Sequence, residues 1–266
     1  MTEPIILVSN DDGFSARGIR ALASVLRPLG RVIVVAPLVD QSAVSHAMSL
    51  RRPLRLTQEN DIVTPHGDIP VYAIDGTPTD AVYMAVHHIL KEEQVALLVS
   101  GINHGANLGD DVLYSGTVSA AMEAASLGIP AVAFSLVSNH DHDFTKAAEF
   151  AYGLCQTLLK NTLPKGTLLN VNVPKRVDHF NYAITTMGHH GYTCVVDERL
   201  DPGGRPYYWI GGEWKGYSDL PGTDCNAVAE GLISVTPIEV TLTCERVIPW
   251  LKSLSIEGFT GKESLS

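Results

Sequence analysis

The chain has 266 residues, of which 45% are hydrophobic and 18% charged, and its formal net charge is −10. Such an acidic chain is a poor candidate for broad nucleic-acid binding, which depends on a positive surface, although a bound cation or a helix N-terminus can still attract one phosphate group. The length allows one large α/β domain or two small ones, and no apolar run approaches the roughly 20 residues that span a bilayer, so we expect neither a membrane nor a stable nucleic acid as partner.

The start of the chain and its cysteines favour a cytoplasmic protein. The first apolar run soon ends in acidic residues, so the pattern of a secretory signal is missing. The cysteines lie far apart and form no C-x-x-C pair, which suits buried apolar side chains in a reducing compartment better than a disulfide framework. They are Cys155, Cys194, Cys225 and Cys244.

The N-terminal part of the chain predicts a strand, a helix and a second strand. Ile5–Val8 and Arg31–Ala36 are short apolar runs typical of buried strands. Between them, Gly18–Leu29 has apolar residues at helical spacing, and Gly30 is a suitable cap. This order predicts a βαβ unit, in which the two strands are parallel and end at the same edge of the sheet.

Strands and helices alternate through the middle of the chain. Strands are predicted at Arg51–Thr57, Val71–Ile74, Val95–Val99 and Ala131–Ser135, and helices at Ala81–Lys91, Val118–Leu127 and Phe144–Leu159. A long loop rich in glycine, Ser100–Asp111, follows the third of these strands. Glycine in such a loop often indicates that the backbone approaches a ligand.

The character of the sequence changes at Leu168, where longer, antiparallel strands become the expectation. The predicted strands are Leu168–Val173, Asn181–Met187, Cys194–Asp197, Tyr207–Ile210, Ile233–Val235 and Val240–Leu242, with helices at Thr223–Leu232 and Arg246–Leu254. We therefore predict a single α/β domain over residues 1–266. Residues 1–167 form a Rossmann-like, mostly parallel sheet with helices on both faces, and residues 168–266 form an antiparallel β-hairpin extension with closing elements.

Several catalytic motifs are absent from the sequence. It has no G-x-x-x-x-G-K-[ST], no G-x-G-x-x-G, no G-x-S-x-G and no H-E-x-x-H, which argues against nucleoside triphosphatases, dehydrogenases, serine hydrolases and zinc proteases. The segment His140–Asp143 lacks a third and fourth zinc ligand at a recognised spacing. We predict a solvated acidic loop there.

Oxygen-bearing side chains follow three of the predicted parallel strands. Asp11 and Asp12 follow the first strand, Ser42 the second and Asn103 a later one. Open α/β sheets bind ligands at this carboxyl edge, and two carboxylates, a hydroxyl and an amide suit Mg²⁺, Mn²⁺ or Ca²⁺. The alternative is an Asx-rich turn that only caps the next helix. Further along, Ser115 opens a small-residue helix whose N-terminal N–H groups make an anion site.

Six short segments, in order along the chain from residue 5 to about residue 240, together resemble one known family. They are Ser9–Gly13, Ser42-Ala43, Gly76–Asp80, Ser100–Asn103 with Gly105, Asn107 and Gly109, Tyr114–Val118, and Pro221–Asp224. They look like the signature segments of the SurE (survival protein E) family of metal-dependent nucleotidases. Two positions depart from the pattern: Gln41 stands where relatives often carry a basic residue, and Glu239 where some carry a histidine.

The resemblance implies a function and a set of site residues. The function is hydrolysis of nucleoside 5′- or 3′-monophosphates to nucleoside and phosphate, with one Mg²⁺ or Mn²⁺ per subunit, and some members also trim short polyphosphate. The implied metal ligands are Asp11, Asp12, Ser42 and Asn103, of which Asp11 and Asp12 are also catalytic through the metal. The implied phosphate-binding residues are Asn107, Ser115, Gly116 and Thr117.

Two other functions remain open at this point. One is a phosphatase that uses Asp11 as a nucleophile, and the other is a catalytically silent nucleotide-binding module on the same fold. We expect direct attack by water, because Asp12 is assigned to the metal and no spare acid stands beside Asp11 to protonate a leaving group.

A segment rich in aromatic residues predicts how the subunits assemble. Tyr192–Tyr217 is interrupted by glycines and holds many of the tyrosines and tryptophans of the chain. Exposed aromatic patches commonly mark interfaces between subunits. We therefore expect a homodimer or homotetramer that forms through this hairpin region, as the resemblance also suggests.

Overall fold

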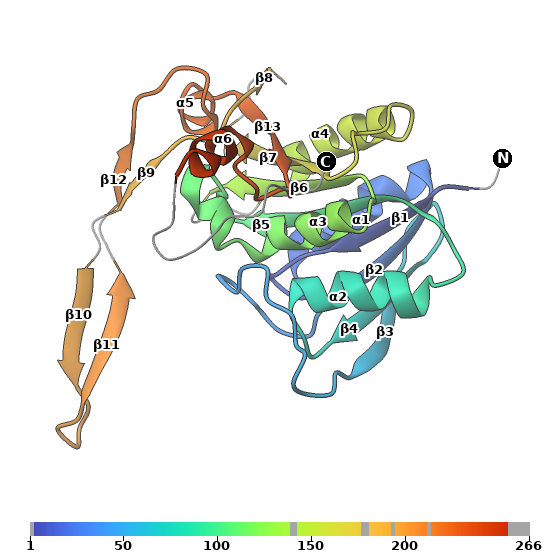
Figure 1. Cartoon of the computed structure of the whole chain (residues 1–266). Helices are drawn as coiled ribbons and strands as arrows, with labels where there is room; N and C mark the ends of the chain where they lie inside the picture. The colour runs from blue at the N-terminus through green and yellow to red at the C-terminus, as the bar shows by residue number, and fades with distance from the viewer. Residues whose placement is uncertain (1–2, 139–142, 177–180, 193–194, 212–213, 255–266) are drawn as a thin grey trace.

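A nine-stranded sheet lies at the centre of the described structure, with the strand order β3-β4-β2-β1-β5-β6-β7-β13-β8 (Figure 1). The structure is a computed structural model that describes residues 3–138, 143–176, 181–192, 195–211 and 214–254. Most of the predicted acidic loop His140–Asp143, and Cys194 with it, therefore lie outside the described residues. No helix in the described ranges is both long enough and apolar enough to cross a bilayer.

The middle of this sheet is parallel, as predicted. The parallel strands are β4 (Ile69–Ile74), β2 (Arg31–Pro37), β1 (Ile5–Ser9), β5 (Val95–His104), β6 (Ala131–Val137) and β7 (Thr167–Pro174). Their apolar side chains are buried on both faces, which explains why they are continuous apolar runs rather than alternating ones. The predicted βαβ unit is confirmed, because β1 and β2 pair in parallel.

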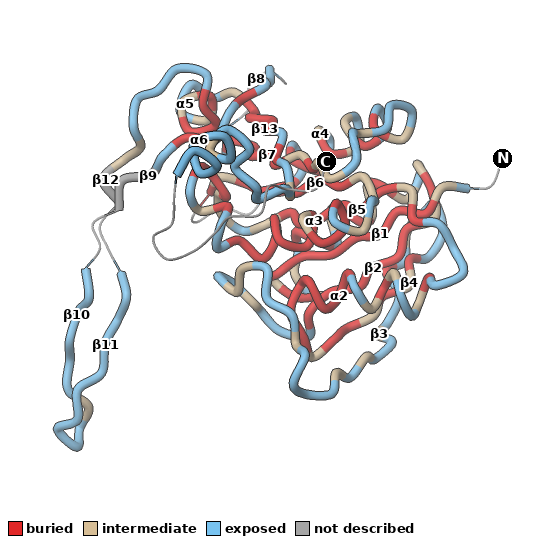
Figure 2. The backbone as a smooth tube through the Cα atoms, in the orientation of Figure 1, coloured by how far each residue is buried: buried red, intermediate tan, exposed pale blue. Residues whose placement is uncertain are grey.

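Helices cover both faces of the sheet, as predicted (Figures 1 and 2). Helices α1 (Arg17–Leu26) and α4 (Thr145–Leu158) pack with one apolar cluster, which includes Ile6 and Val8. Helices α2 (Pro78–Met84) and α3 (Gly116–Ser126) pack with the other, which includes Leu7. Successive β1 residues thus serve opposite cores, as the alternation of side chains along a strand requires. Short helical turns extend α1 and α2 at Arg27–Leu29 (η1) and Ala85–Ile89 (η2).

Several strands differ from the prediction in their extent or in their pairing, among them β5, β3 and β7. β5 continues to His104, five residues past the predicted end, because Gly101 and its neighbours stay buried beside β6. At one edge, β3 (Leu56–Ile62) is an antiparallel partner of β4 and lies further along the chain than predicted. β7 still runs parallel to β6, so the parallel region extends past the expected change at Leu168, and the antiparallel partner of β7 is β13 (Ile233–Glu239).

A β-hairpin arm projects from the sheet domain, which agrees with the predicted antiparallel extension (Figure 1). The arm comprises β9 (His190–Tyr192) paired with β12 (Trp214–Tyr217), and β10 (Val195–Leu200) paired with β11 (Pro206–Gly211), both antiparallel. Every residue of β10 and β11 is exposed (Figure 2). Strands β10 and β11 therefore contribute nothing to the core of their own subunit.

The remaining elements belong to the C-terminal third of the chain. They are the edge strand β8 (Tyr182–Ile184), α5 (Asp224–Ala229), and the C-terminal turn η4 (Glu245–Val247) with α6 (Ile248–Lys252). β8 pairs in parallel with β13, and the side chain of Thr223 caps α5. Residues 240–242, predicted as a strand, form none in the structure.

Candidate active site

Asp11 and Asp12 follow directly after β1, where the chain turns at Gly13 with a φ of 96°. Asp11 is 5% exposed and the side chain of Asp12 is 10% exposed. Burial raises the pKa of Asp11 to about 6, and the charge of Asp12 adds to the rise. Burial likewise raises the pKa of Asp12 to about 6. Two adjacent buried carboxylates with raised pKa values indicate a site that is complete only with positive charge.

The N-terminus of α3 lies against Asp11. The hydroxyl of Thr117 donates a hydrogen bond to Asp11 Oδ1. A Cβ atom at Gly116 would lie only 2.6 Å from Asp11 Cβ and 2.9 Å from Oδ2, so this position has no room for a side chain. Ser115 is the N-cap of α3, where its Oγ accepts a hydrogen bond from the Val118 N–H at 3.1 Å. The N-terminus of α3 thus holds a carboxylate of the protein itself.

Strand β5 brings a second group of polar residues to Asp12. Ser9 of β1 is in register with Ser100 of β5, so the residues that follow both lie at the same edge. His104 Nδ1 lies 3.5 Å from Asp12 Oδ1, and the neighbouring Asn103 donates its amide nitrogen to the carbonyl of Gly105 at 3.0 Å. This bond uses the nitrogen, and not the oxygen, of the Asn103 amide.

Ser42 lies in the loop after β2, which contacts the acidic turn. The Gln41 N–H donates to the carbonyl of Asp11 at 2.8 Å, which places Ser42 next to a residue in contact with the acidic turn. Ser42 itself is exposed, and its N–H donates to Asp40 Oδ1 at 2.7 Å. Further along, Ser45 donates its hydroxyl to the carbonyl of Leu113 at 2.7 Å. The loop therefore bridges the end of β1 and the segment that leads into α3.

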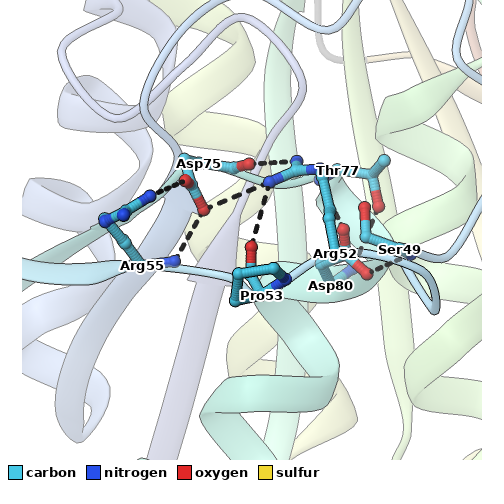
Figure 3. Close-up of polar contacts among 7 residues, drawn as sticks. All are labelled: Ser49, Arg52, Pro53, Arg55, Asp75, Thr77 and Asp80. Atoms are coloured by element: carbon cyan, nitrogen blue, oxygen red, sulfur yellow. Dashed lines mark hydrogen bonds and ion pairs between the residues drawn. The ribbon is translucent and has the colours of Figure 1, made fainter.

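Polar contacts around the segment Gly76–Asp80 hold the far end of this loop (Figure 3). The Asp80 carboxylate accepts hydrogen bonds from the backbone N–H groups of Ser49 and Thr77, both at 2.9 Å. Thr77 also caps α2 and donates its hydroxyl to the carbonyl of Ala47 at 2.7 Å. This segment anchors the loop that carries Ser42.

A second acid in the same region binds the chain that follows the loop. Asp75 Oδ1 accepts a hydrogen bond from the Arg55 N–H at 2.7 Å and lies 3.5 Å from the guanidinium of Arg52 (Figure 3). The hydrogen bond from the Arg55 N–H, together with the positive charges of the Arg52 and Arg55 side chains, holds the pKa of Asp75 below its ordinary value. Sequence reasoning did not identify these contacts, because they join loop residues about 20 positions apart that β3 and β4 bring together.

Asn107 belongs to a buried network of asparagines that sequence reasoning missed. Its N–H donates to Asn172 Oδ1 at 2.8 Å, its carbonyl accepts the amide groups of Asn170 and Asn172, and its own amide donates to Ser135 Oγ at 2.7 Å. Asn170 and Asn172 alternate with apolar residues in β7 and are fully buried. Polar residues two apart inside an apolar strand point to the same face, and this was the available signal.

The residues at this edge have the chemistry of a site for a hard divalent cation. Asp12 Oδ2 is buried and, within the described part of the chain, has no hydrogen-bond partner. A buried carboxylate oxygen without a partner is costly unless a cation neutralises it. In the described residues no three His, Cys, Asp or Glu side chains come together, so a full shell would need the hydroxyl and amide oxygens of Ser42 and Asn103. Such an all-oxygen set suits a hard cation such as Mg²⁺, Mn²⁺ or Ca²⁺.

Comparison with known proteins identifies the family. The family model described as Survival protein SurE matches residues 6–194. The 5'-nucleotidase SurE of Myxococcus xanthus (strain DK1622) is 48% identical over 97% of this chain and 96% of its own length, and that of Anaeromyxobacter sp. (strain Fw109-5) is 47% identical over 98% and 99%. The crystal structure of the SurE protein from Aquifex aeolicus has a TM-score of 0.80 at 38% identity, covering 94% of this chain and 98% of that one. The predicted family is confirmed, and this chain belongs to the SurE family.

Proposed function

We propose that this protein is a hydrolase of phosphoric monoesters that converts nucleoside 5′-monophosphates, and also 3′-monophosphates, into nucleoside and phosphate. The observation that carries the proposal is the buried pair Asp11 and Asp12 at the carboxyl edge of the sheet, in which Asp12 Oδ2 has no partner among the described residues. Relatives named 5'-nucleotidase SurE that align over nearly the whole chain support it.

The proposal includes one Mg²⁺ or Mn²⁺ per subunit. Asp11, Asp12, Ser42 and Asn103 would hold the ion. When bound, a divalent cation supplies positive charge that lowers the pKa of a water molecule and offsets the negative charge of the transition state. The raised pKa values of the two carboxyls support this assignment, since a cation would favour their charged forms.

Residues of the chain itself orient these groups. The hydroxyl of Thr117 donates a hydrogen bond to one oxygen of Asp11. Because Gly116 has no side chain, the N-terminus of α3 can lie close to Asp11. We assign Asn107, Ser115, Gly116 and Thr117 to the phosphate-binding part of the site. Because the hydroxyls of Ser115 and Thr117 and the N–H of Ser115 already bond within the protein, the contribution of this turn to phosphate binding rests mainly on the position that it gives Asp11.

Attack by water fits the contacts better than attack by Asp11. A nucleophilic carboxylate needs an oxygen free to reach phosphorus, whereas Asp11 is 5% exposed, binds Thr117 and packs against Gly116. Direct attack inverts the configuration at a phosphorus made chiral with oxygen isotopes, and a phosphoenzyme formed on Asp11 would retain it.

The test is a substrate panel with control of metal. Phosphate release is measured from nucleoside 5′- and 3′-monophosphates, nucleoside triphosphates, sugar phosphates and polyphosphate, in excess chelator and after addition of Mg²⁺ or Mn²⁺. We expect turnover of the monophosphates that stops in chelator and returns with the metal. Full turnover in chelator after dialysis would contradict the metal role, and tight nucleotide binding without hydrolysis would support the silent module.

We further propose that the arm pairs with another subunit in a homodimer or homotetramer, and that the enzyme works in the cytoplasm. The apolar residues of β10 and β11 are exposed in the single chain, and Ile210 is 93% exposed. Burying such side chains against a partner is favourable, whereas leaving them in water favours non-specific association.

A further inference from the structure

Asp224 joins two distant segments of the chain to the start of α5 through one carboxylate. It is fully buried at the start of α5. Its Oδ2 accepts the Gly109 N–H at 2.9 Å, and its Oδ1 accepts the N–H groups of Gly188 and Cys225, both at 2.8 Å. Backbone hydrogen bonds to an ionised carboxylate in a buried place are strong, and losing one leaves a buried donor without a partner.

The first of these segments is the active-site loop, residues 103–109. It begins at the proposed metal ligand Asn103 and passes through Asn107, whose carbonyl and N–H are held by the asparagines of β7. It ends at Gly109, where the 3₁₀ turn η3 (Gly109–Leu113) begins. Asp224 therefore fixes the end of the loop opposite to the metal ligand.

The second segment is the root of the arm. Gly188 lies two residues before β9, and a Cβ atom there would lie 2.8 Å from Cys225 Sγ and 3.1 Å from Asp224 Oδ1. Beside it, His189 Nδ1 lies 3.3 Å from Asp110 of η3, and the carbonyl of His189 accepts the Ser218 N–H at 3.1 Å. Both strands at the root of the arm are thus tied to the same place as the active-site loop.

We propose that Asp224 is a positioning residue that holds the active-site loop in its phosphate-binding geometry and couples it to the root of the arm. None of its hydrogen bonds within the described structure is to Asp11, Asp12, Ser42 or Asn103, so it acts through the backbone and not through the metal. The inference rests on the proposed function, because it takes the loop to be part of the phosphate site.

Two variants test the coupling from its two sides. Asp224→Asn keeps the shape of the side chain but replaces one acceptor oxygen with an N–H₂ group, so at least one backbone donor loses its partner. Gly188→Ala acts from the arm, since its Cβ pushes on Asp224 and Cys225 without touching the site. Gly211→Ala is the matched control, because Gly211 belongs to the arm strand β11 and has open space around its Cα.

The measurement separates phosphate affinity from metal affinity, well below the melting temperature of each variant. In the presence of Mg²⁺, both test variants should raise the inhibition constant of inorganic phosphate and the KM of the nucleotide by roughly 5- to 150-fold, the factor that corresponds to one lost buried hydrogen bond. The affinity for Mn²⁺, measured by calorimetry, should stay unchanged because the carboxylates of β1 do not contact Asp224. Gly211→Ala should match the wild type in its affinity for phosphate and in its affinity for Mn²⁺.

Several outcomes would overturn the inference. A loss of phosphate affinity in Asp224→Asn but not in Gly188→Ala removes the link to the arm, and equal losses of phosphate and Mn²⁺ affinity make Asp224 a general stabilising residue. If either variant does not fold, the coupling is tested by amide hydrogen exchange in the wild type, with and without phosphate. Binding is reciprocal, so saturating phosphate should slow exchange of the Gly188 and Cys225 amides, and unchanged exchange rejects the coupling.

Failure of the proposed function gives a different result. If the wild type neither binds inorganic phosphate nor hydrolyses nucleotides, the proposed function is wrong, and the coupling is then read from amide exchange alone. The Gly109 amide should exchange faster in Gly188→Ala than in the wild type or in Gly211→Ala. Equal exchange in all three proteins would overturn the coupling whatever the enzyme does.

Discussion

At the scale of single residues, the active site costs stability. Asp11 is buried beside the largely buried Asp12, and burial opposes the charged form of both. A protein selected only for stability would carry neutral residues there, because an uncompensated buried charge costs free energy. The pair is therefore better explained by the cation proposed to bind there than by the fold.

Asp12→Asn should separate the contribution of Asp12 to activity from its cost in stability. We expect activity to fall by roughly a hundredfold or more, because one ligand to the metal is lost. In chelator the unfolding free energy should rise by about 1 to 3 kcal/mol, because a buried charge with a raised pKa is removed. Urea denaturation and phosphate release measure the two, and Asp61→Asn, at an exposed site on β3, is the control. A variant less stable than the wild type in chelator would contradict this account.

The raised pKa values of the same two carboxyls predict that the folding stability of the metal-free protein depends on pH. Their pKa values rise from 3.8 in the unfolded chain to about 6, so the folded state binds their protons more tightly. By linkage, their contribution to stability is present below about pH 4 and is lost as the pH rises through about 6. In chelator, the stability difference between the wild type and the Asp11→Asn/Asp12→Asn double variant should widen from pH 5 to pH 7.5, to the disadvantage of the wild type. A constant difference would mean that neither pKa is raised.

At the scale of elements, the site depends on how closely α3 approaches the end of β1. Gly116→Ala places a Cβ atom 2.6 Å from the Cβ of Asp11, so either the helix or the acidic turn must move. We expect a large loss of activity and of Mn²⁺ affinity from this single methyl group. Gly153→Ala is the matched control, because this helical glycine of α4 has nothing within 4 Å and alanine favours a helix. Normal Mn²⁺ affinity in Gly116→Ala would show that the contact is not needed.

The sequence predicts elements well where a single pattern decides them. Buried parallel strands are visible as apolar runs, and the carboxyl ends of these strands locate Asp11, Asp12 and Asn103 at one edge. The sequence predicts fewer features where contacts between residues far apart in the chain determine the structure. Gly101 stays within β5 because of the neighbouring β6, and Pro237 stays within β13 because it pairs with Leu169 of β7. The contact of Thr117 with Asp11 spans 106 positions and has no local signal.

At the scale of the whole molecule, the sheet domain and the arm differ in what holds them together. The sheet domain has two apolar clusters, one on each face of the sheet, whereas the side chains of β10 and β11 face water in the single chain. An isolated two-stranded hairpin is marginally stable at best. The arm therefore depends on contacts that a single chain does not supply, and we expect a second subunit to provide them.

Ile210→Lys tests this dependence. Ile210 is 93% exposed in β11, so a lysine there disturbs nothing within one subunit, but it would bury a charge if the arm packs against a partner. Val63→Lys is the matched control, because Val63 is 81% exposed and lies beyond β3 at the far edge of the sheet. Multi-angle light scattering at micromolar concentration should give a dimer or tetramer for the wild type and for Val63→Lys. Ile210→Lys should shift towards the monomer while the melting of the sheet domain is retained. A monomeric wild type, or an assembly that tolerates lysine at position 210, would mean that the hairpin serves another purpose.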